Sequence, residues 1–399
     1  MVRIQKFSEL ALRAELLQAV NDLRFATPTP IQTLALPPAL TGCDVLASAP
    51  TGSGKSAAFG LPILQACLNT PQRETRALIL APTRELVQQI TDHLRDLAKY
   101  TKIRVAAVYG GAGMGPQVQA FRRKSEIIVA TPGRLIDLLE QGEARLGNIS
   151  MLVLDEADRM LDMGFLPQVR RIIAALPAQR QTLFFSATLG TSVTNLAAQL
   201  LREPVRVNLA PKVVPVDTVS QSVYAVEQHR KTDLLVDLLK DNRIYSALVF
   251  TRTKARAERL AGALARHNIA AERIHGDRSQ AQRTRVLDGF KKGRYRILVA
   301  TDVAARGIDI RDLGHVINYD VPHEPADYIH RVGRTARAQR SGDAFTFVSS
   351  EETELFGQIE RSIGQRLERA DHPLADASVI KTLEKPSTPR RRSFSRRRR

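Results

Sequence analysis

The sequence predicts an α/β protein made of two similar units, each a mostly parallel sheet with helices on both faces. Three observations lead to this fold class. Short apolar runs alternate with longer segments of helical period along most of the chain. At 399 residues the chain is long for one hydrophobic core, which favours two domains. The two halves also repeat one pattern of strand endings, as expected for two copies of one unit.

The first half alternates between strands and helices. The expected strands are "DVLAS" at 44–48, "RALILA" at 76–81, "EIIVA" at 126–130 and "MLVL" at 151–154. The helical segments that follow the first three strands are 55–68, 83–100 and 131–141. Short strands that alternate with longer helices predict a parallel sheet with helices on both faces.

The alternation stops near Leu201, where the stretch 202–218 has three prolines and no helical period. Such a stretch is typical of a linker. The alternation resumes with strands expected at 246–251, 296–301, 315–319 and 344–349, and 351–370 is expected to be a closing helix. The predicted domains are 1–207 and 218–370, with a linker at 208–217 and a disordered basic tail at 371–399.

The halves resemble each other in detail. "ALILAPTRELVQQITDHL" at 77–94 pairs with "ALVFTRTKARAERLAGAL" at 247–264, each a strand ending before Thr-Arg and a helix. "EIIVATPGRL" at 126–135 pairs with "RILVATDVAARGI" at 296–308. Because ligands of open α/β sheets bind at the carboxyl ends of the strands, we expect functional residues there and between the two units.

The charge balance predicts a polyanionic partner, either nucleic acid or an acidic membrane surface. Lys and Arg number 59 against 41 Asp and Glu, a net charge of +18. Residues 385–399 contain one lysine, seven arginines and no acid, so we expect a disordered tether to phosphates. A mere solubility tail is the alternative.

Several classes are disfavoured. No apolar run approaches the length of a membrane span, and "MVRIQKFSEL" lacks the apolar stretch of a signal peptide, so we expect a cytoplasmic protein without a membrane partner. The two cysteines have no metal-ligand spacing and form no disulfide framework.

The segment "SAPTGSGKS" at 48–56 follows a strand and precedes a helix, which is the context of a phosphate-binding loop. Ala49 occupies the place of the first glycine, so the strict pattern is missed by one residue. Gly52 and Gly54 allow backbone N–H groups to face phosphate oxygens, Lys55 would neutralise the β- and γ-phosphates, and the Ser56 hydroxyl would ligate Mg²⁺. The predicted nucleotide-binding loop is Ala49, Pro50, Thr51, Gly52, Ser53, Gly54, Lys55 and Ser56. A simple glycine turn before a helix is the alternative.

Two adjacent acids follow the apolar strand "MLVL". Asp155 would hold the metal through water, and Glu156 would orient and deprotonate the attacking water. An acidic pair after a strand is common by itself, but beside a phosphate loop it indicates nucleotide hydrolysis.

Upstream, "RFATPTPIQ" at 24–32 contains a candidate for recognition of the base. The Gln32 amide can pair with the N6/N7 edge of adenine, and Phe25 offers a face for stacking. Taken by itself, the segment fits a proline-rich turn with a core phenylalanine equally well. Its position before the phosphate loop favours the interpretation as a base-recognition segment.

The segment "HRVGRTARAQR" at 330–340 has four arginines at a three-residue step and no acid. It predicts either a solvated helix face or a site for phosphate. On a helix Arg334 and Arg337 would share one face, whereas Arg331 and Arg340 would point to opposite sides.

Together these residues resemble the DEAD-box RNA helicases of superfamily 2, of the bacterial RhlE/SrmB-like kind. The resemblance covers nearly all of residues 5–350. Its motifs occur in the family's order: Phe7, "FATPTPIQ" (25–32), "APTGSGKS" (49–56), "PTREL" (82–86), "GG" (110–111), "TPGR" (131–134), "DEAD" (155–158), "SAT" (186–188), "VFTRT" (249–253), "HGD" (275–277), "QAQR" (280–283), "ATDVAARGID" (300–309) and "HRVGRTAR" (330–337). It implies two RecA-like domains that close on ATP, Mg²⁺ and single-stranded RNA, with local strand separation.

The resemblance also implies roles for single residues. Arg334 and Arg337 would be arginine fingers that reach the γ-phosphate, and Asp309 would contact the ribose. Asp158, Ser186, Thr188 and His330 would couple the nucleotide to domain closure. The implied RNA contacts are Pro82, Thr83, Arg84, Gly111, Thr131, Gly133 and Arg134 in the first half, and Gln280, Arg283, Thr301 and Asp302 in the second.

Three positions depart from the family's usual pattern: Ser56 replaces threonine, Arg24 replaces a glycine and Ala336 replaces another. Ser56 keeps the hydroxyl, and we expect Ala336 to be helical. With no Trp and 5% aromatic residues, we expect recognition of the RNA backbone, in single strands or short duplexes, with little sequence preference.

The interpretation is an RNA-stimulated ATPase and helicase, expected as a monomer acting in ribosome assembly or RNA decay. The alternatives are a non-enzymatic RNA clamp and a DNA-directed helicase on the same fold.

Overall fold

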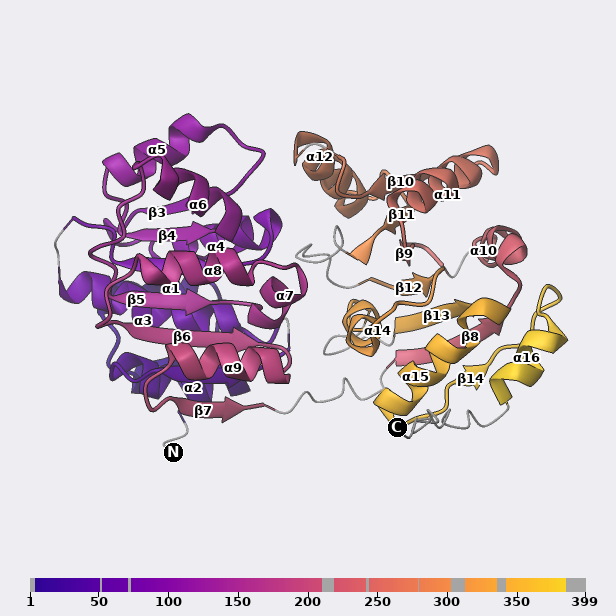
Figure 1. Cartoon of the computed structure of the whole chain (residues 1–399), viewed down its shortest axis with the longest axis horizontal. Helices are drawn as coiled ribbons and strands as arrows, with labels where there is room; N and C mark the ends of the chain where they lie inside the picture. Colours follow the sequence, from indigo (N-terminus) through magenta and orange to yellow (C-terminus); the bar gives the residue numbers. More distant parts are fainter. Residues whose placement is uncertain are drawn as a thin grey trace, which may run out of the picture. The chain divides into compact units, whose positions relative to one another are not determined.

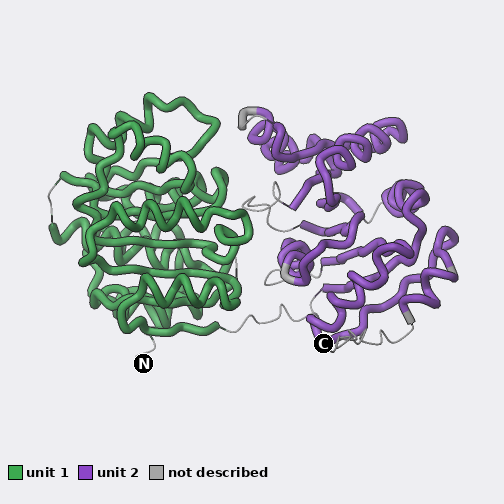
Figure 2. The backbone as a smooth tube through the Cα atoms, in the orientation of Figure 1, with its two compact units in different colours: residues 1–212 green, residues 213–399 purple. Residues whose placement is uncertain are grey.

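The computed structural model describes residues 4–50, 52–70, 73–209, 219–241, 244–278, 280–302, 313–335 and 342–384. The chain divides into two compact units, residues 1–212 and 213–399 (Figure 2). Within the described residues, each unit contains a seven-stranded sheet in which all paired strands run parallel. The predicted fold class, two parallel α/β units with surrounding helices, is therefore confirmed.

The first unit has the strand order β3-β4-β2-β5-β6-β1-β7. The strands are β1 (Val45–Ser48), β2 (Ala77–Leu80), β3 (Val105–Val108), β4 (Ile127–Ala130), β5 (Met151–Leu154), β6 (Gln181–Ser186) and β7 (Val205–Asn208). The helices are α1 (Ala14–Asp22), α2 (Pro30–Leu40), α3 (Lys55–Asn69), α4 (Arg84–Leu97), α5 (Met114–Arg122), α6 (Pro132–Glu140), α7 (Ala157–Asp162), α8 (Leu166–Ala174) and α9 (Thr191–Leu200), preceded by a 3₁₀ turn at Phe7–Glu9.

Helices cover both faces of this sheet (Figure 1), and a hydrophobic core lies on each face. Successive strand residues point to opposite faces, so Ile79 packs with α1–α4 in one core while Leu78 packs with α6–α9 in the other. Strands buried on both faces read as continuous apolar runs, which explains why "ALIL", "IIVA" and "MLVL" could be recognised in the sequence.

The second unit has the order β10-β11-β9-β12-β13-β8-β14. Its strands are β8 (Val219–Ala225), β9 (Ala247–Phe250), β10 (Ala271–Ile274), β11 (Ile297–Ala300), β12 (His315–Asn318), β13 (Gly342–Val348) and β14 (Glu368–Arg369). Its helices are α10 (Lys231–Leu238), α11 (Lys254–Arg266), α12 (Gln280–Lys291), α14 (Pro325–Val332), α15 (Thr353–Ile363) and α16 (Ala377–Glu384), with 3₁₀ turns at Gln228–Arg230 and Ser350–Glu352.

The predicted repeat is visible in the topology. The two strand orders correspond position by position, so β2 matches β9 and β4 matches β11, the pairs identified from the sequence echo. The match extends to the helix caps. Thr83 accepts a hydrogen bond from the Leu86 amide at the start of α4, and Thr253 accepts one from the Arg256 amide at the start of α11.

Three local predictions need correction. The linker stretch 202–218 contains β7, which pairs with β1 in the first sheet, and residues 210–218 lie outside the described residues. Part of the tail predicted at 371–399 is helix α16, whose Val379 and Leu383 are buried. The helix expected through 330–340 ends at Val332, so Arg334 lies in the following turn.

Candidate functional site

Apart from Phe25 and Gln32, which precede β1, the predicted functional residues of the first unit follow the carboxyl ends of six strands, and the strand order sorts them into two groups. The segments after β1, β5 and β6, which are neighbours in the sheet, are 49–56, 155–158 and 186–188. The segments after β2, β3 and β4, which lie on the other side, are 82–84, 110–111 and 131–134. The residues predicted to bind the nucleotide therefore lie at the carboxyl ends of three neighbouring strands. The residues predicted to bind RNA lie at the carboxyl ends of the next three strands of the same sheet.

The phosphate-loop segment has the backbone that its glycines were expected to provide. Gly52 and Gly54 have φ values of 80° and 97°, in the left-handed region that favours glycine. Lys55 begins α3 and is buried, and its Nζ donates to the Ala49 carbonyl at 3.2 Å. The same Nζ lies 3.8 Å from Oδ1 of Asp155. A cation is therefore fixed beside the loop and opposite an acid.

Gln32 connects the upstream segment to this loop. Its Oε1 accepts from the Thr29 amide at 2.9 Å, and its Nε2 donates to the Gly54 carbonyl at 3.0 Å. A Cβ at Gly54 would lie 2.6 Å from Nε2, so only glycine permits this approach. An amide carries two donor hydrogens and two acceptor lone pairs, and Gln32 therefore keeps capacity for the adenine edge.

Phe25, predicted to stack on the base, packs between other rings. Its centroid lies 6.4 Å from that of Phe7 and 5.9 Å from that of His93. Arg24, which stands in place of the family's glycine, has a φ of 56°. This turn therefore requires the left-handed conformation, at a cost on the order of 1–2 kcal/mol for a residue with a Cβ.

The two acids after β5 have different surroundings. Asp155 is buried, and burial raises its pKa to about 6 although Lys55 acts in the opposite direction. Glu156 has φ 50° and ψ 51°, an uncommon conformation for glutamate, at the start of α7. Its Oε2 lies 2.5 Å from Nη1 of Arg159, a residue that sequence reasoning did not single out.

Asp158 joins the acidic segment to Ser186–Thr188, and all of these residues except Ala187 were expected to have a coupling role. Its Oδ2 accepts from the backbone amides of Ala187 and Thr188 at 3.1 and 2.9 Å and from the Thr188 hydroxyl at 3.0 Å. The Ser186 hydroxyl accepts from the Asp158 amide at 3.3 Å and donates to the Thr188 carbonyl at 2.6 Å. A shift of either segment must therefore disturb the other.

The three segments predicted to contact RNA also touch one another. The position that a Cβ of Gly111 would take lies 2.0 Å from Nη1 of Arg84, so the arginine rests directly on the glycine backbone. Arg134 donates from Nη1 to the Ala112 carbonyl at 3.2 Å. Two guanidinium groups are thus held next to residues 110–112. Gly133 lies in the first turn of α6, and the other predicted residues of these segments are buried: Pro82, Thr83 and Thr131.

In the second unit the first arginine of the run at 330–340 has a protein acid as its partner. Arg331 is buried, and its Nε and Nη2 donate to Oδ1 and Oδ2 of Asp302 at 2.6 and 2.7 Å. Its Nη1 donates to Oδ1 of Asn318 and to the Asp320 carbonyl. Asp302, predicted to contact RNA, is therefore engaged in a bidentate ion pair, and Arg331 is a residue that the sequence reasoning missed.

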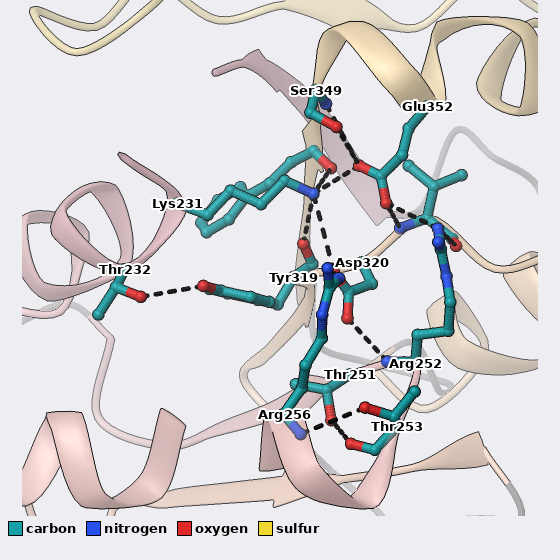
Figure 3. A network of polar contacts seen from close by, with 12 residues as sticks. Lys231, Thr232, Thr251, Arg252, Thr253, Arg256, Tyr319, Asp320, Ser349 and Glu352 are labelled. Atoms are coloured by element: carbon teal, nitrogen blue, oxygen red, sulfur yellow. Dashed lines mark hydrogen bonds and ion pairs between the residues drawn. The ribbon is translucent and has the colours of Figure 1, made fainter. Parts of the chain in front are cut away.

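Asp320 belongs to a larger buried network at the carboxyl ends of β9, β12 and β13 (Figure 3). Lys231 is fully buried and donates to the carbonyls of Tyr319 and Phe347 and, at 2.5 Å, to Oε2 of Glu352. The pKa of Lys231 is lowered, because burial outweighs the opposing effect of Glu352 and Asp320. The Asp320 carboxylate accepts from the Arg252 amide and pairs with Arg256, and Arg252 in turn donates to Glu352.

Some predicted residues cannot be tested. Thr51, Asp309, Ala336 and Arg337 lie outside the described residues, and the side chain of Gln280 is not described. His330 lies in the last turn of α14, Arg334 follows that helix, Arg283 lies in α12 and Thr301 is buried directly after β11.

The composition of the first group fits a magnesium nucleotide. A helix N-terminus with two glycines in the left-handed region presents backbone donors, Lys55 supplies a cation, and Ser56 and Asp155 supply the oxygen ligands that Mg²⁺ prefers.

Comparison with known proteins decides the family. Residues 29–196 match the DEAD/DEAH box helicase family, and residues 230–339 match the helicase conserved C-terminal domain. The chain belongs to the DEAD-box family of ATP-dependent RNA helicases. This helicase is 42% identical over 373 residues to the DEAD-box ATP-dependent RNA helicase CshA of Geobacillus kaustophilus, covering 94% of this chain and 80% of the relative. It is 45% identical over 384 residues to the ATP-dependent rRNA helicase RRP3 of Candida glabrata, covering 96% of this chain and 77% of the relative.

Solved structures agree with this family. Dbp5 of S. cerevisiae bound to RNA and ADP BeF3 matches with a TM-score of 0.83 and 32% identity, over 96% of this chain and 100% of that one. The DEAD-box helicase Mss116 bound to ssRNA and UDP-BeF matches with a TM-score of 0.84 and 29% identity, over 95% of this chain and 82% of that one. Among the helices of the described ranges, none combines the length and apolarity needed to cross a membrane.

Proposed function

We propose that this helicase hydrolyses ATP with Lys55, Asp155 and Glu156 as its catalytic residues in the first unit. The observation that carries the proposal is the buried ion pair between Lys55 of the phosphate loop and Asp155, the neighbour of Glu156 in the chain. Lys55 would exchange Asp155 for the β- and γ-phosphates. Glu156 would then orient the attacking water and accept its proton.

Further residues select and hold the nucleotide. Gln32 would read the adenine edge while keeping its bond to the Gly54 carbonyl, so base recognition and loop conformation would be linked. Ser56 and Asp155 would hold Mg²⁺, which neutralises phosphate charge when bound. The arginines 334 and 337 belong to the second unit, so complete hydrolysis would need both units.

RNA would be recognised through its backbone. Arg84 lies against Gly111 and Arg134 donates to the Ala112 carbonyl, and both would offer guanidinium donors for phosphates without reading bases. Asp158 and its bonds to residues 186–188 would transmit the state of the nucleotide. We assign the cellular role to ribosome assembly or RNA decay, in the cytoplasm and as a monomer.

The test is unwinding of a short RNA duplex of about 10 base pairs with ATP and Mg²⁺, beside a DNA duplex of the same sequence. The wild type is expected to separate only the RNA, whereas Lys55→Ala and Glu156→Gln should separate neither. Equal activity on DNA, or activity that survives in Glu156→Gln, would contradict the proposal. Omission of Mg²⁺ should abolish separation and tests the assignment of the metal.

A further inference from the structure

The residue immediately after the acidic motif, Arg159, is buried against the predicted catalytic base. The side chains of Arg159 and Glu156 are 10% and 7% exposed, and Nη1 of the arginine lies 2.5 Å from Oε2 of the glutamate. Few water molecules can reach such a pair, so the charge-assisted bond is not weakened as a surface ion pair would be.

The local backbone creates this contact. The left-handed conformation at Glu156 ends the strand segment and begins α7, and the helix then places Arg159 three residues further along on the same side. A non-glycine residue in this conformation is uncommon, and strained residues concentrate at sites where the geometry has a function. The strained backbone and the ion pair therefore belong to the same residue, Glu156.

A carboxylate held in this way is a poor general base. A base must present a free lone pair to the water whose proton it accepts, at hydrogen-bond distance. The carboxylate keeps lone pairs on Oε1, but the guanidinium group on Oε2 fixes its orientation, so Arg159 decides which water the carboxylate can reach. One charge-assisted hydrogen bond corresponds to about 10- to 100-fold in an equilibrium between held and released carboxylate.

The hold is incomplete on the side of the arginine. Within the described part of the chain, Nε and Nη2 of Arg159 are buried and have no hydrogen-bond partner. Buried donors without partners destabilise a conformation, so any rearrangement that supplies acceptors to them favours release of Glu156.

The start of α7 is also tied to the coupling segment. The Arg159 amide donates to Oδ1 of Asp158, whose Oδ2 accepts from the backbone of Ala187 and Thr188. A displacement of residues 186–188 would therefore move the first turn of α7 and, with it, Arg159. Movement of residues 186–188 could therefore separate Arg159 from Glu156 through this chain of hydrogen bonds.

We propose that Arg159 is a positioning residue that restrains Glu156 in the conformation described here and suppresses hydrolysis until RNA binding opens the pair. This inference rests on the proposed role of Glu156 as the base. It predicts that loss of Arg159 raises the rate without RNA rather than lowering every rate.

The experiment measures kcat and KM for ATP hydrolysis by the full-length protein, without RNA and with saturating poly(U). Arg159→Met should raise kcat without RNA by about 10- to 100-fold. The RNA-saturated kcat and the KM for ATP should stay within about threefold, since these reflect the released state and the phosphate loop. Arg369→Met is the matched control, because Arg369 forms a partly buried pair with Glu360 in the second unit, and it should leave the stimulation by RNA unchanged.

Equal decreases in kcat with and without RNA, or no change in either, would overturn the inference and leave Arg159 a structural residue. If Arg159→Met does not fold, Arg159→Lys decides, because a single ammonium cannot reproduce the guanidinium geometry and should still raise the RNA-free kcat severalfold. Glu156→Gln separates the two hypotheses. Hydrolysis that survives in Glu156→Gln refutes the proposed base, whereas its loss together with an unchanged Arg159→Met refutes only the restraint.

Discussion

Replacement of Lys231 by methionine tests whether the buried network of the second unit stabilises the fold. Methionine keeps most of the side-chain volume and removes the charge. The ammonium group donates to the Tyr319 and Phe347 carbonyls at 2.8 and 3.2 Å and to Glu352 at 2.5 Å, and it is 0% exposed. All three acceptors lose this donor when the lysine is removed.

The expected loss in the free energy of unfolding depends on which hydrogen bonds Glu352 keeps when Lys231 is removed. Removal of one partner of a buried ion pair costs about 3–5 kcal/mol. Glu352 keeps bonds from the Ser349 amide and hydroxyl, from the Val321 amide and from Arg252, so its charge is not left without donors. We therefore expect the lower end, about 3 kcal/mol in the free energy of unfolding of the second unit. With an m-value of about 2 kcal/mol/M this lowers the urea midpoint by about 1.5 M.

The assay is urea denaturation of the full chain followed by circular dichroism, since the sequence has no Trp for fluorescence. Hydrogen exchange of β9, β12 and β13 assigns the transition to the second unit. Lys240→Met is the matched control, because Lys240 pairs with Asp237 at 2.9 Å but is 71% exposed, and its midpoint should not move measurably. Equal shifts for the two variants would refute the reasoning. A Lys231→Met/Glu352→Gln double variant should lose less than the sum of the single variants.

Three further predictions concern the first unit. Only one thiol of the native chain should react with a thiol reagent such as Ellman's reagent, because Cys43 is exposed whereas burial raises the pKa of Cys67 to about 12; reaction of both before unfolding would contradict this. Since the folded pKa of Asp155 is raised from 3.8 to about 6, the folded chain binds more protons than the unfolded chain between these values. The free energy of unfolding without nucleotide should therefore fall as pH rises through this window, by up to about 3 kcal/mol, and urea midpoints of Asp155→Asn should lack this component. Gln32→Ala should weaken ATP binding about tenfold and GTP binding less, since only the loss of the bond to the Gly54 carbonyl affects both nucleotides; titration calorimetry measures this, and equal losses for both would refute base recognition.

Much of the fold and of the candidate nucleotide site could be predicted because each group of site residues directly follows a strand that is visible in the sequence. A strand buried on both faces is a visible apolar run, and the residues after it lie at the carboxyl edge of the sheet. Lys55 after β1 and Asp155 after β5 therefore came together although 100 residues separate them. The β7 segment "VRVN" was missed because Arg206 and Asn208 are exposed at the edge and interrupt the apolar pattern.

The missed contacts involve partners that no local pattern connects. Arg331 lies 29 residues from Asp302, and Lys231 lies 121 residues from Glu352. The three-residue step of the arginines also suggested a longer helix than the chain forms. Gly333 has low helix propensity, and the buried Thr335 hydroxyl donates to the Leu313 carbonyl at 2.8 Å, so tertiary contacts turn the chain after Val332.

Steady-state phosphate release measures directly whether RNA binding and ATP hydrolysis are coupled. ATP hydrolysis by the full chain would be measured alone, with single-stranded RNA and with DNA of the same sequence. We expect strong stimulation by RNA and little by DNA. Hydrolysis at one rate in all three conditions would contradict this coupling, because the phosphate loop and the arginines proposed to bind RNA would then act independently.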